Sequence, residues 1–230
     1  MPSAGPPQAG THPLGGSAGV HHGRGAVMTV HELTTLEIKV FSNAAVYAAL
    51  QESLPSAGGK LLGVFASDIG ELSQVLILRE FADANALADA RMQMLLADNP
   101  LGVGEWLVKL GSQSYKLFPF LPAIEPGAMG RWYEFRTYSI RQGVLAQTID
   151  AWRDAIPART ALSPMVGAFT ALDGEQPRFL NIWAYPSVDE RARIRAEAVQ
   201  KGVWPPKGGP ANLTRMQSTL CAPVAFSPLK

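Results

Sequence analysis

The stretch MVGAFTALDGEQPRFLNIWAY, residues 165–185, decides the fold. It holds two apolar runs, Met165–Leu172 and Arg178–Tyr185, separated by a polar turn, which is the pattern of two paired β-strands. The stretch KLLGVFASDIGELSQVLILREF, residues 60–81, has the same organisation. Its Gly63-Val64-Phe65 falls on Gly167-Ala168-Phe169, 104 residues later (167 − 63 = 104). Together with further landmarks at the same offset, this match predicts an internal duplication.

Outside these two hairpins, the spacing of apolar residues predicts a strand and a helix before each and a helix and a strand after it. In the first copy the predicted elements are a strand at Leu36–Phe41, a helix at Asn43–Leu54, strands at Lys60–Ser67 and Gln74–Phe81, a helix that Asp83 caps and that ends near Ala97, and a strand at Ser112–Leu121. In the second copy they are a strand at Arg131–Ile140, a helix at Val144–Ile156 that Pro157 ends, strands at Met165–Leu172 and Arg178–Tyr185, a helix at Val188–Val199 that Ser187 caps, and a strand near Gln217–Val224. The order βαββαβ is that of a ferredoxin-like unit.

The sequence therefore predicts an α+β chain of two tandem ferredoxin-like repeats, residues 28–125 and 130–230. The first strands are aligned by placing Leu36-Glu37-Ile38-Lys39 on Tyr133-Glu134-Phe135-Arg136. Residues 1–27 contain seven glycines, four prolines and no acid, a composition that predicts a disordered tail.

The charge balance limits the partners that this chain can attract. Twenty basic residues face nineteen acidic ones, so the formal net charge is only +1. A near-neutral surface gives no long-range attraction for a polyanion, which argues against nucleic acid as a partner. No apolar run approaches the ~20 residues that a membrane-spanning helix needs.

Cysteine and histidine are too scarce for several kinds of site. Cys221 is the single cysteine, and three of the four histidines lie in the predicted tail, which leaves His31. A disulfide, a multi-histidine zinc site or a Ser-His-Asp triad therefore has too few residues. We expect no metal and no cofactor, and a cytoplasmic location suits the lone thiol.

The repeats are expected to pack sheet against sheet. Each unit has helices on one face of its sheet, so the bare faces of the two copies can cover each other and form an α/β barrel of the dimeric kind within one chain. The wholly apolar set Leu180, Ile182 and Ala184 is expected to pack on the helices. The set expected to face the barrel interior is then Glu134, Arg136, Tyr138, Asn181, Trp183 and Tyr185.

Two motifs in the second copy resemble the NIPSNAP family. Tyr133-Glu134-Phe135-Arg136-Thr137-Tyr138 is similar to the Y-E-L-R-x-Y strand that opens a NIPSNAP domain. Ile182-Trp183-Ala184-Tyr185-Pro186-Ser187, followed by Glu190-Arg191, resembles its L-W-x-Y-x-S signature with a trailing E-R. The resemblance implies a dimeric α/β-barrel fold and leaves the activity undefined. Asn181 stands where a histidine is usual in the family, which implies that any proton chemistry of that histidine is absent here.

Three functions are compatible with these residues. The first is the binding of a small apolar or aromatic ligand between the two sheets, by Glu134, Arg136, Tyr138, Asn181, Trp183 and Tyr185. The second is a metal-independent isomerase, cyclase or monooxygenase in which Glu134 moves a proton and Arg136 or Tyr138 stabilises negative charge. The third is a homo-oligomeric scaffold for other proteins. The series Arg191, Arg193, Arg195 is interpreted as a solvated helix face.

Overall fold

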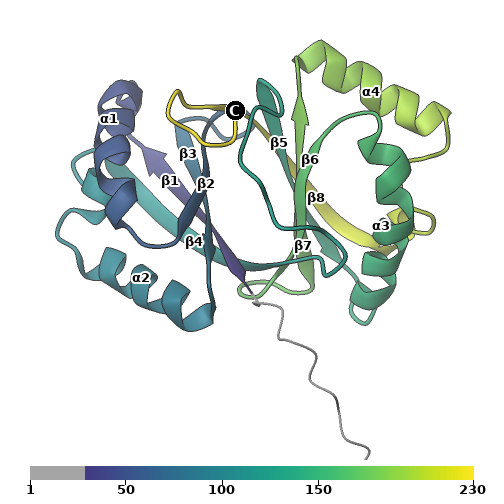
Figure 1. Cartoon of the computed structure of the whole chain (residues 1–230), viewed down its shortest axis with the longest axis horizontal. Coiled ribbons are helices and arrows are strands. Elements are labelled where there is room, and N and C mark those ends of the chain that lie inside the picture. The colour runs from purple at the N-terminus through teal and green to yellow at the C-terminus, as the bar shows by residue number, and fades with distance from the viewer. Residues whose placement is uncertain (1–28) are drawn as a thin grey trace, which may run out of the picture.

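Two four-stranded antiparallel sheets face each other and join at both edges into a closed eight-stranded barrel, with two helices outside each sheet (Figure 1). The structure is a computed structural model and describes residues 29–230, so the predicted tail, residues 1–27, lies outside the described residues. The first copy comprises β1 (Val30–Ile38), α1 (Asn43–Ser53), β2 (Lys60–Ile69), β3 (Gln74–Phe81), α2 (Ala84–Leu96) and β4 (Leu107–Leu117). The second comprises β5 (Trp132–Ile140), α3 (Leu145–Thr160), β6 (Met165–Ala171), β7 (Arg178–Tyr185), α4 (Val188–Gln200) and β8 (Leu213–Pro223).

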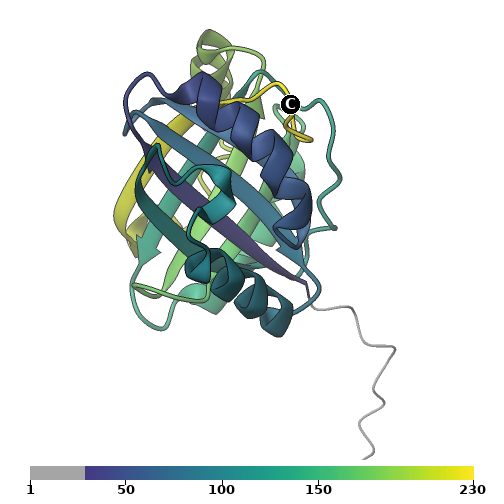
Figure 2. The same ribbon diagram turned by 90° about the vertical axis from the view of Figure 1, so that its left-hand side faces the viewer.

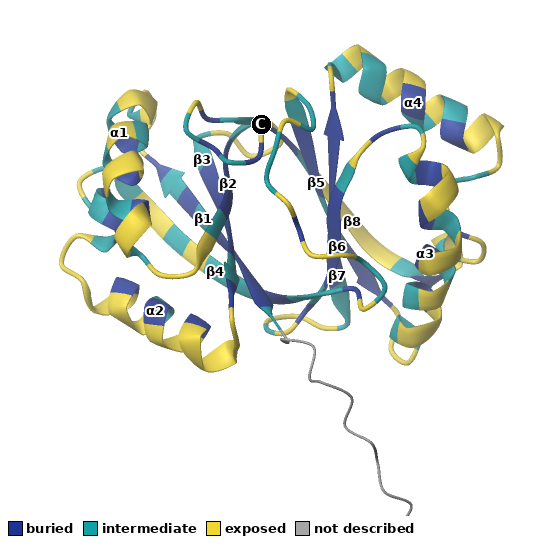
Figure 3. Cartoon of the chain, viewed as in Figure 1, coloured by how far each residue is buried: buried dark blue, intermediate teal, exposed yellow. Residues whose placement is uncertain are grey.

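The strand order around the barrel is β1-β3-β2-β8-β5-β7-β6-β4, which confirms two βαββαβ units with the first and third strands of each as neighbours. The copies meet where β2 pairs with β8 and β4 pairs with β6. Helices α1 and α2 cover the outer face of the first sheet (Figure 2). Exposed residues follow the outer sides of all four helices, whereas the strands are largely buried (Figure 3). Within residues 29–230 no helix is long and apolar enough to cross a membrane.

The first strand differs from its prediction. It begins at Val30 rather than Leu36 and ends at Ile38, and the side chains of Val40 and Phe41 are exposed. Since β1 and β5 are both nine residues long, equivalent positions differ by 102 (132 − 30 = 102). Glu32, not Glu37, is therefore the counterpart of Glu134, and the predicted alignment of the two first strands was wrong by five residues.

Both predicted N-caps of the second helices are confirmed. The Asp83 carboxylate accepts a hydrogen bond from the backbone N–H of Ala86 at 2.9 Å, and the Ser187 hydroxyl accepts one from the N–H of Glu190 at 3.0 Å. The expectation that Pro157 ends a helix was wrong, because α3 continues to Thr160. A proline inside a helix lacks the N–H donor and crowds the carbonyl four residues earlier, but the residues after it can still take helical geometry, and here one further turn follows it.

The two faces of the second sheet are reversed relative to the prediction. The barrel interior is an apolar core from both copies that includes Leu180, Ile182 and Ala184, packed with first-copy residues such as Phe65. The alternate residues of β5 and β7, among them Tyr138, Trp183 and Tyr185, pack beneath α3 and α4. Apolar side chains therefore fill the centre of the barrel, and a pocket of about 600 Å³ is lined by interior-facing residues of the first sheet such as Leu33, Thr35 and Gln113. The predicted site residues of the second copy lie between the second sheet and its helices.

A segment of each copy also packs against the other copy. After β4, Phe118 donates its backbone N–H to Ala168 at 2.8 Å and packs beside Trp152 of the second copy. After β8, Val224 donates its N–H to Val64 at 3.0 Å, and the chain continues to Leu229, which is fully buried in the barrel core. The C-terminus thus ends between the two halves (Figure 1).

Candidate functional site

Glu134 is the centre of a buried ion-pair cluster on β5. Its side chain has no solvent exposure, because β7 and β8 flank the strand and α4 covers it. The oxygen Oε1 accepts hydrogen bonds from Arg136 Nη1, from Arg191 Nη2 at 2.5 Å and from the Ser218 hydroxyl at 2.7 Å. The oxygen Oε2 lies 3.8 Å from Arg195 Nη1. One carboxylate therefore ties β5 to β8 and to α4.

The ionisation of Glu134 follows from these contacts. Burial alone would raise the pKa of its carboxyl, but the Arg191 hydrogen bond, the Arg136 charge and the Ser218 hydroxyl outweigh burial and lower the pKa to about 2. A carboxylate held ionised by several donors is a weak base, since proton uptake would break those bonds. The arrangement thus disfavours Glu134 as the group that moves a proton.

The predicted residues of β7 lie close together, and their polar groups are hydrogen-bonded to one another or to neighbouring residues. The Asn181 amide donates to the Arg136 carbonyl at 3.0 Å and accepts from the Trp183 indole N–H at 2.8 Å. The buried guanidinium of Arg159 stacks over the Trp183 ring at 4.2 Å and donates to the Tyr185 hydroxyl at 3.2 Å. Asn181, Trp183 and Tyr185 therefore form a layer of satisfied polar groups beneath the helices.

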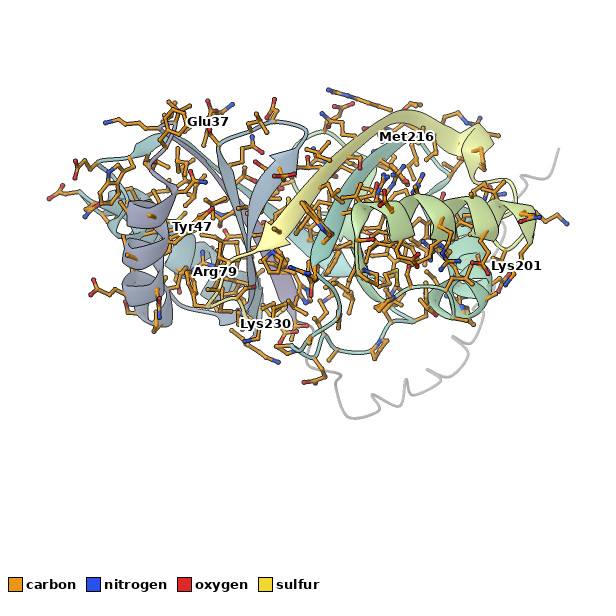
Figure 4. The ribbon with its side chains drawn as sticks, turned by 90° about the horizontal axis from the view of Figure 1, so that it is seen from above. Glu37, Tyr47, Arg79, Lys201, Met216 and Lys230 are labelled. Atoms are coloured by element: carbon orange, nitrogen blue, oxygen red, sulfur yellow. The ribbon has the colours of Figure 1, made fainter. Side chains whose placement is uncertain are left out.

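A cavity of about 270 Å³ opens beside this layer. Its lining comes from β5, β7, β8, α3, α4 and the loop between α4 and β8, and consists of Arg136, Tyr138, Thr148, Trp152, Phe179, Arg195, Val199, Trp204, Pro205, Pro206, Gly209, Pro210, Leu213 and Met216. Seen from above, β8 arches along one side of the second half, with Met216 on it, and α4 runs beside it (Figure 4). Of the six predicted ligand-binding residues, Arg136 and Tyr138 line this cavity.

Edge-to-face aromatic pairs build one wall of the cavity. The Trp152 ring lies 4.8 Å from Trp204 and 5.2 Å from Phe179, with interplanar angles of 84° and 82°. Phe179 in turn meets Tyr138 at 5.2 Å and 90°. Such pairs stabilise each other beyond simple burial, so these four rings form a preorganised surface.

The same positions are aliphatic in the first copy. Four lining residues of the cavity have counterparts in the first copy: Tyr138, Thr148, Trp152 and Phe179 correspond to Leu36, Val46, Leu50 and Val75. The shift is 102 in the first strand and helix and 104 in the third strand (178 − 74 = 104). All four aliphatic residues are fully buried in one core cluster. The duplication therefore supplies an internal comparison, in which three aromatic rings and a threonine hydroxyl distinguish these positions of the second copy.

Sequence reasoning missed several residues of this site. Arg191 and Arg195 were interpreted as a solvated face together with Arg193, but only Arg193 lies on the outer side, paired with Glu190 and Glu197. The signal was present, because a spacing of four residues puts 191 and 195 on one helix face and 193 on another. No local signal shows that Trp152, Trp204 and Ser218 converge, because they reach the site from separate elements.

The remaining candidates for acid–base or thiol chemistry are deactivated by burial. Desolvation and the nearby Lys116 charge lower the pKa of His31 to about 4, and the ring packs on Phe169 at 5.1 Å. Burial raises the pKa of the Cys221 thiol to about 12. Residues 29–230 contain no group of three His, Cys, Asp or Glu side chains arranged to hold a metal ion.

The fold and the site define a class of protein: a single-chain α/β barrel of two ferredoxin-like units, with a cavity beneath the helices of one of them. Solved structures of this fold include a "putative monooxygenase" from Lactobacillus acidophilus, with a TM-score of 0.64 and 10% identity over 85% of this chain and 94% of that one. An anthrone oxidase-like protein matches with a TM-score of 0.63 and 11% identity over 88% of this chain and 94% of that one. At such identities the likeness extends to the fold alone.

The chain belongs to the NIPSNAP family. A sequence model of the family matches residues 31–100 and again 133–228, one match in each copy. A NipSnap homolog of Dictyostelium discoideum is 27% identical over 212 residues, which are 85% of this chain and 87% of that protein. The two family matches begin at His31 and Tyr133, so they share the shift of 102 that the strands show.

Proposed function

We propose that this protein binds a small apolar or aromatic ligand in the cavity between the second sheet and helices α3 and α4. The observation that carries the proposal is the difference between the copies: three aromatic rings and a threonine line a cavity at positions where the first copy packs aliphatic side chains. Packing alone does not require aromatic rings at these positions, since the first copy buries aliphatic side chains there.

The dimensions and the lining of the cavity limit the ligand. Pockets for drug-sized molecules measure about 300–1,000 Å³, so a volume of about 270 Å³ suits one or two fused rings. The four-ring wall offers edges and faces for stacking, and Pro205, Pro206 and Leu213 add apolar surface to the lining. A flat, largely apolar molecule fits this combination.

Replacing Trp204 with leucine is expected to weaken ligand binding at least tenfold, because the indole contributes a ring to the wall and comes from a loop rather than from the sheet. The measurement is thermal melting of the purified protein against a library of small aromatic, lipid-like and carboxylate metabolites. A ligand at 100 times its dissociation constant should add ~2.7 kcal/mol of stability.

The matched control is Trp106→Leu, which removes a partly buried tryptophan from the first copy, away from the cavity. This variant should bind as tightly as the wild type even where its own melting temperature is lower. If no compound shifts the melting of the wild type, or if both variants lose affinity equally, the cavity is not a ligand site.

A second candidate is an enzyme that transforms the bound ligand. It is favoured by Tyr138, whose hydroxyl accepts a hydrogen bond from Arg136 Nε at the cavity wall, so that its own hydrogen is free to be donated to a ligand oxygen. The same screen distinguishes the candidates: mass spectrometry of each stabilising compound after incubation reveals conversion, and Tyr138→Phe should abolish conversion while retaining binding.

A further inference from the structure

We infer that the ligand of this cavity carries an anionic group, most simply a carboxylate, and that Arg195 of α4 binds it. The inference rests on the proposed function, since it assigns one end of the ligand held there. It follows from the charges around the cavity and from the partners that each of them already has.

Positive charge exceeds negative charge at this site. Glu134 is the single carboxylate paired with Arg136, Arg191 and Arg195, and the buried Arg159 adds a fourth guanidinium nearby. The charged side chains that line the cavity are two arginines, and no aspartate or glutamate lies among the lining residues. Buried or half-buried charges of one sign repel one another unless an opposite charge enters, so an anion would be stabilised here.

Among the arginines of this cluster, Arg195 makes the weakest contact with Glu134. Arg136 donates to Glu134 and to Tyr138, and Arg191 donates to Glu134 at 2.5 Å. Arg195 Nη1 stays 3.8 Å from Glu134 Oε2, beyond hydrogen-bond distance, although that oxygen has no hydrogen-bond partner within residues 29–230. Its side chain is 36% exposed and lines the cavity, so its donors can reach an incoming group.

The equivalent arginine of the first copy lines a pocket of about 400 Å³ that has no aromatic wall, and there it has more partners. Arg91 of α2 corresponds to Arg195 by the shift of 104 between the second helices (188 − 84 = 104). Its Nε donates to the buried Glu32 at 2.9 Å, and its other nitrogens contact Ser114 at 3.0 Å and Asp173 at 3.4 Å. Arg91 therefore has two carboxylate partners, whereas Arg195 has one distant partner. A ligand carboxylate would take the place that Asp173 has beside Arg91.

The test compares naphthalene-2-carboxylate with its neutral amide, naphthalene-2-carboxamide, by titration calorimetry at low ionic strength. The wild type should bind the acid roughly tenfold more tightly than the amide, because a hydrogen bond between two charged groups is about twice as strong as a neutral one. Raising the salt concentration should weaken binding of the acid and leave the amide unchanged. In Arg195→Met the preference should vanish, and in Arg195→Lys it should persist.

Arg193→Met is the matched control, because Arg193 lies on the same helix, pairs with Glu190 and Glu197, and does not line the cavity. It should retain the preference of the wild type. Equal binding of acid and amide by the wild type, or a preference that survives in Arg195→Met, overturns the inference while the proposed function stands. If neither compound binds the wild type, the proposed function fails and the inference with it.

Discussion

Replacing Glu134 with glutamine is expected to lower the free energy of unfolding by about 3 kcal/mol at pH 7, as measured by urea unfolding. The substitution preserves the shape of the side chain but removes the charge that Arg136, Arg191 and Arg195 share. Removing one partner of a buried ion pair is costly because the remaining charges stay desolvated without compensation. Since the cluster joins β5 to α4, the loss should appear in the global unfolding transition.

The pH dependence of stability gives a second measure of the free energy that the Glu134 carboxylate contributes. The pKa of Glu134 falls from 4.5 to about 2 on folding, so its contribution is fully present above about pH 4.5 and is lost as the pH falls through about 2. A shift of this size corresponds to about 3 kcal/mol. The wild type should lose this increment in that range, whereas Glu134→Gln should not. The control is Glu190→Gln at an exposed pair, which should leave the stability close to that of the wild type. A Glu134→Gln variant as stable as this control would show that the cluster does not hold the sheet to the helix.

Truncating Leu229 to alanine should destabilise the protein by roughly 2–4 kcal/mol, although the residue is next to last in the chain. Its side chain is fully buried in the barrel core, and its backbone N–H donates to the Leu62 carbonyl at 3.0 Å. Removing a buried isobutyl group leaves a cavity that the strands around it cannot fill without moving. The chain end is held in addition by the Ser227 hydroxyl, which donates to the Leu229 carbonyl at 2.6 Å.

The neighbouring Lys230 provides the control, because its side chain is exposed beside the same segment (Figure 4). Lys230→Ala should unfold within about 0.5 kcal/mol of the wild type in chemical denaturation. If Leu229→Ala were as stable as Lys230→Ala, the C-terminal segment would contribute nothing to the core.

Much of the fold could be predicted from the sequence because its signals are local. The predicted bounds of β3 and β7 are those observed, and Asp83 and Ser187 cap the helices that they were expected to cap. Strand period and helix caps depend on a few consecutive residues, so they can be recognised without knowing the partner elements.

The choice of which strand face lies inside could not be made in this way. Seven of the eight residues of β7 are buried, so both faces of the strand are shielded and alternation carries no contrast between water and core. The start of β1 was missed for a related reason. His31, Glu32 and Thr34 are polar yet buried, and Glu32 is tolerated because Arg79 and Arg91 neutralise it from segments far along the chain.

The site was predicted in part. The sequence predicted that Glu134, Arg136 and Tyr138 lie beside the residues of β7, and in the structure β5, which carries them, pairs with β7. The tryptophans and arginines that surround them come from α3, α4 and the following loop, and their convergence depends on how the helices lie on the sheet. Such contacts have no signature in a single sequence, which is why the predicted site was assigned to the wrong side of the sheet.

The joining of the two units in one chain has an evolutionary consequence. In a symmetric dimer of identical chains, every substitution occurs twice, so a side chain that creates a binding site in one subunit must also be tolerated in the other. Here the segment between β4 and β5 joins both units in one polypeptide, so a substitution occurs once. Leu50 could remain a packing residue while its counterpart became Trp152. The first copy, with its aliphatic core, could then keep the barrel stable while the second copy diverged.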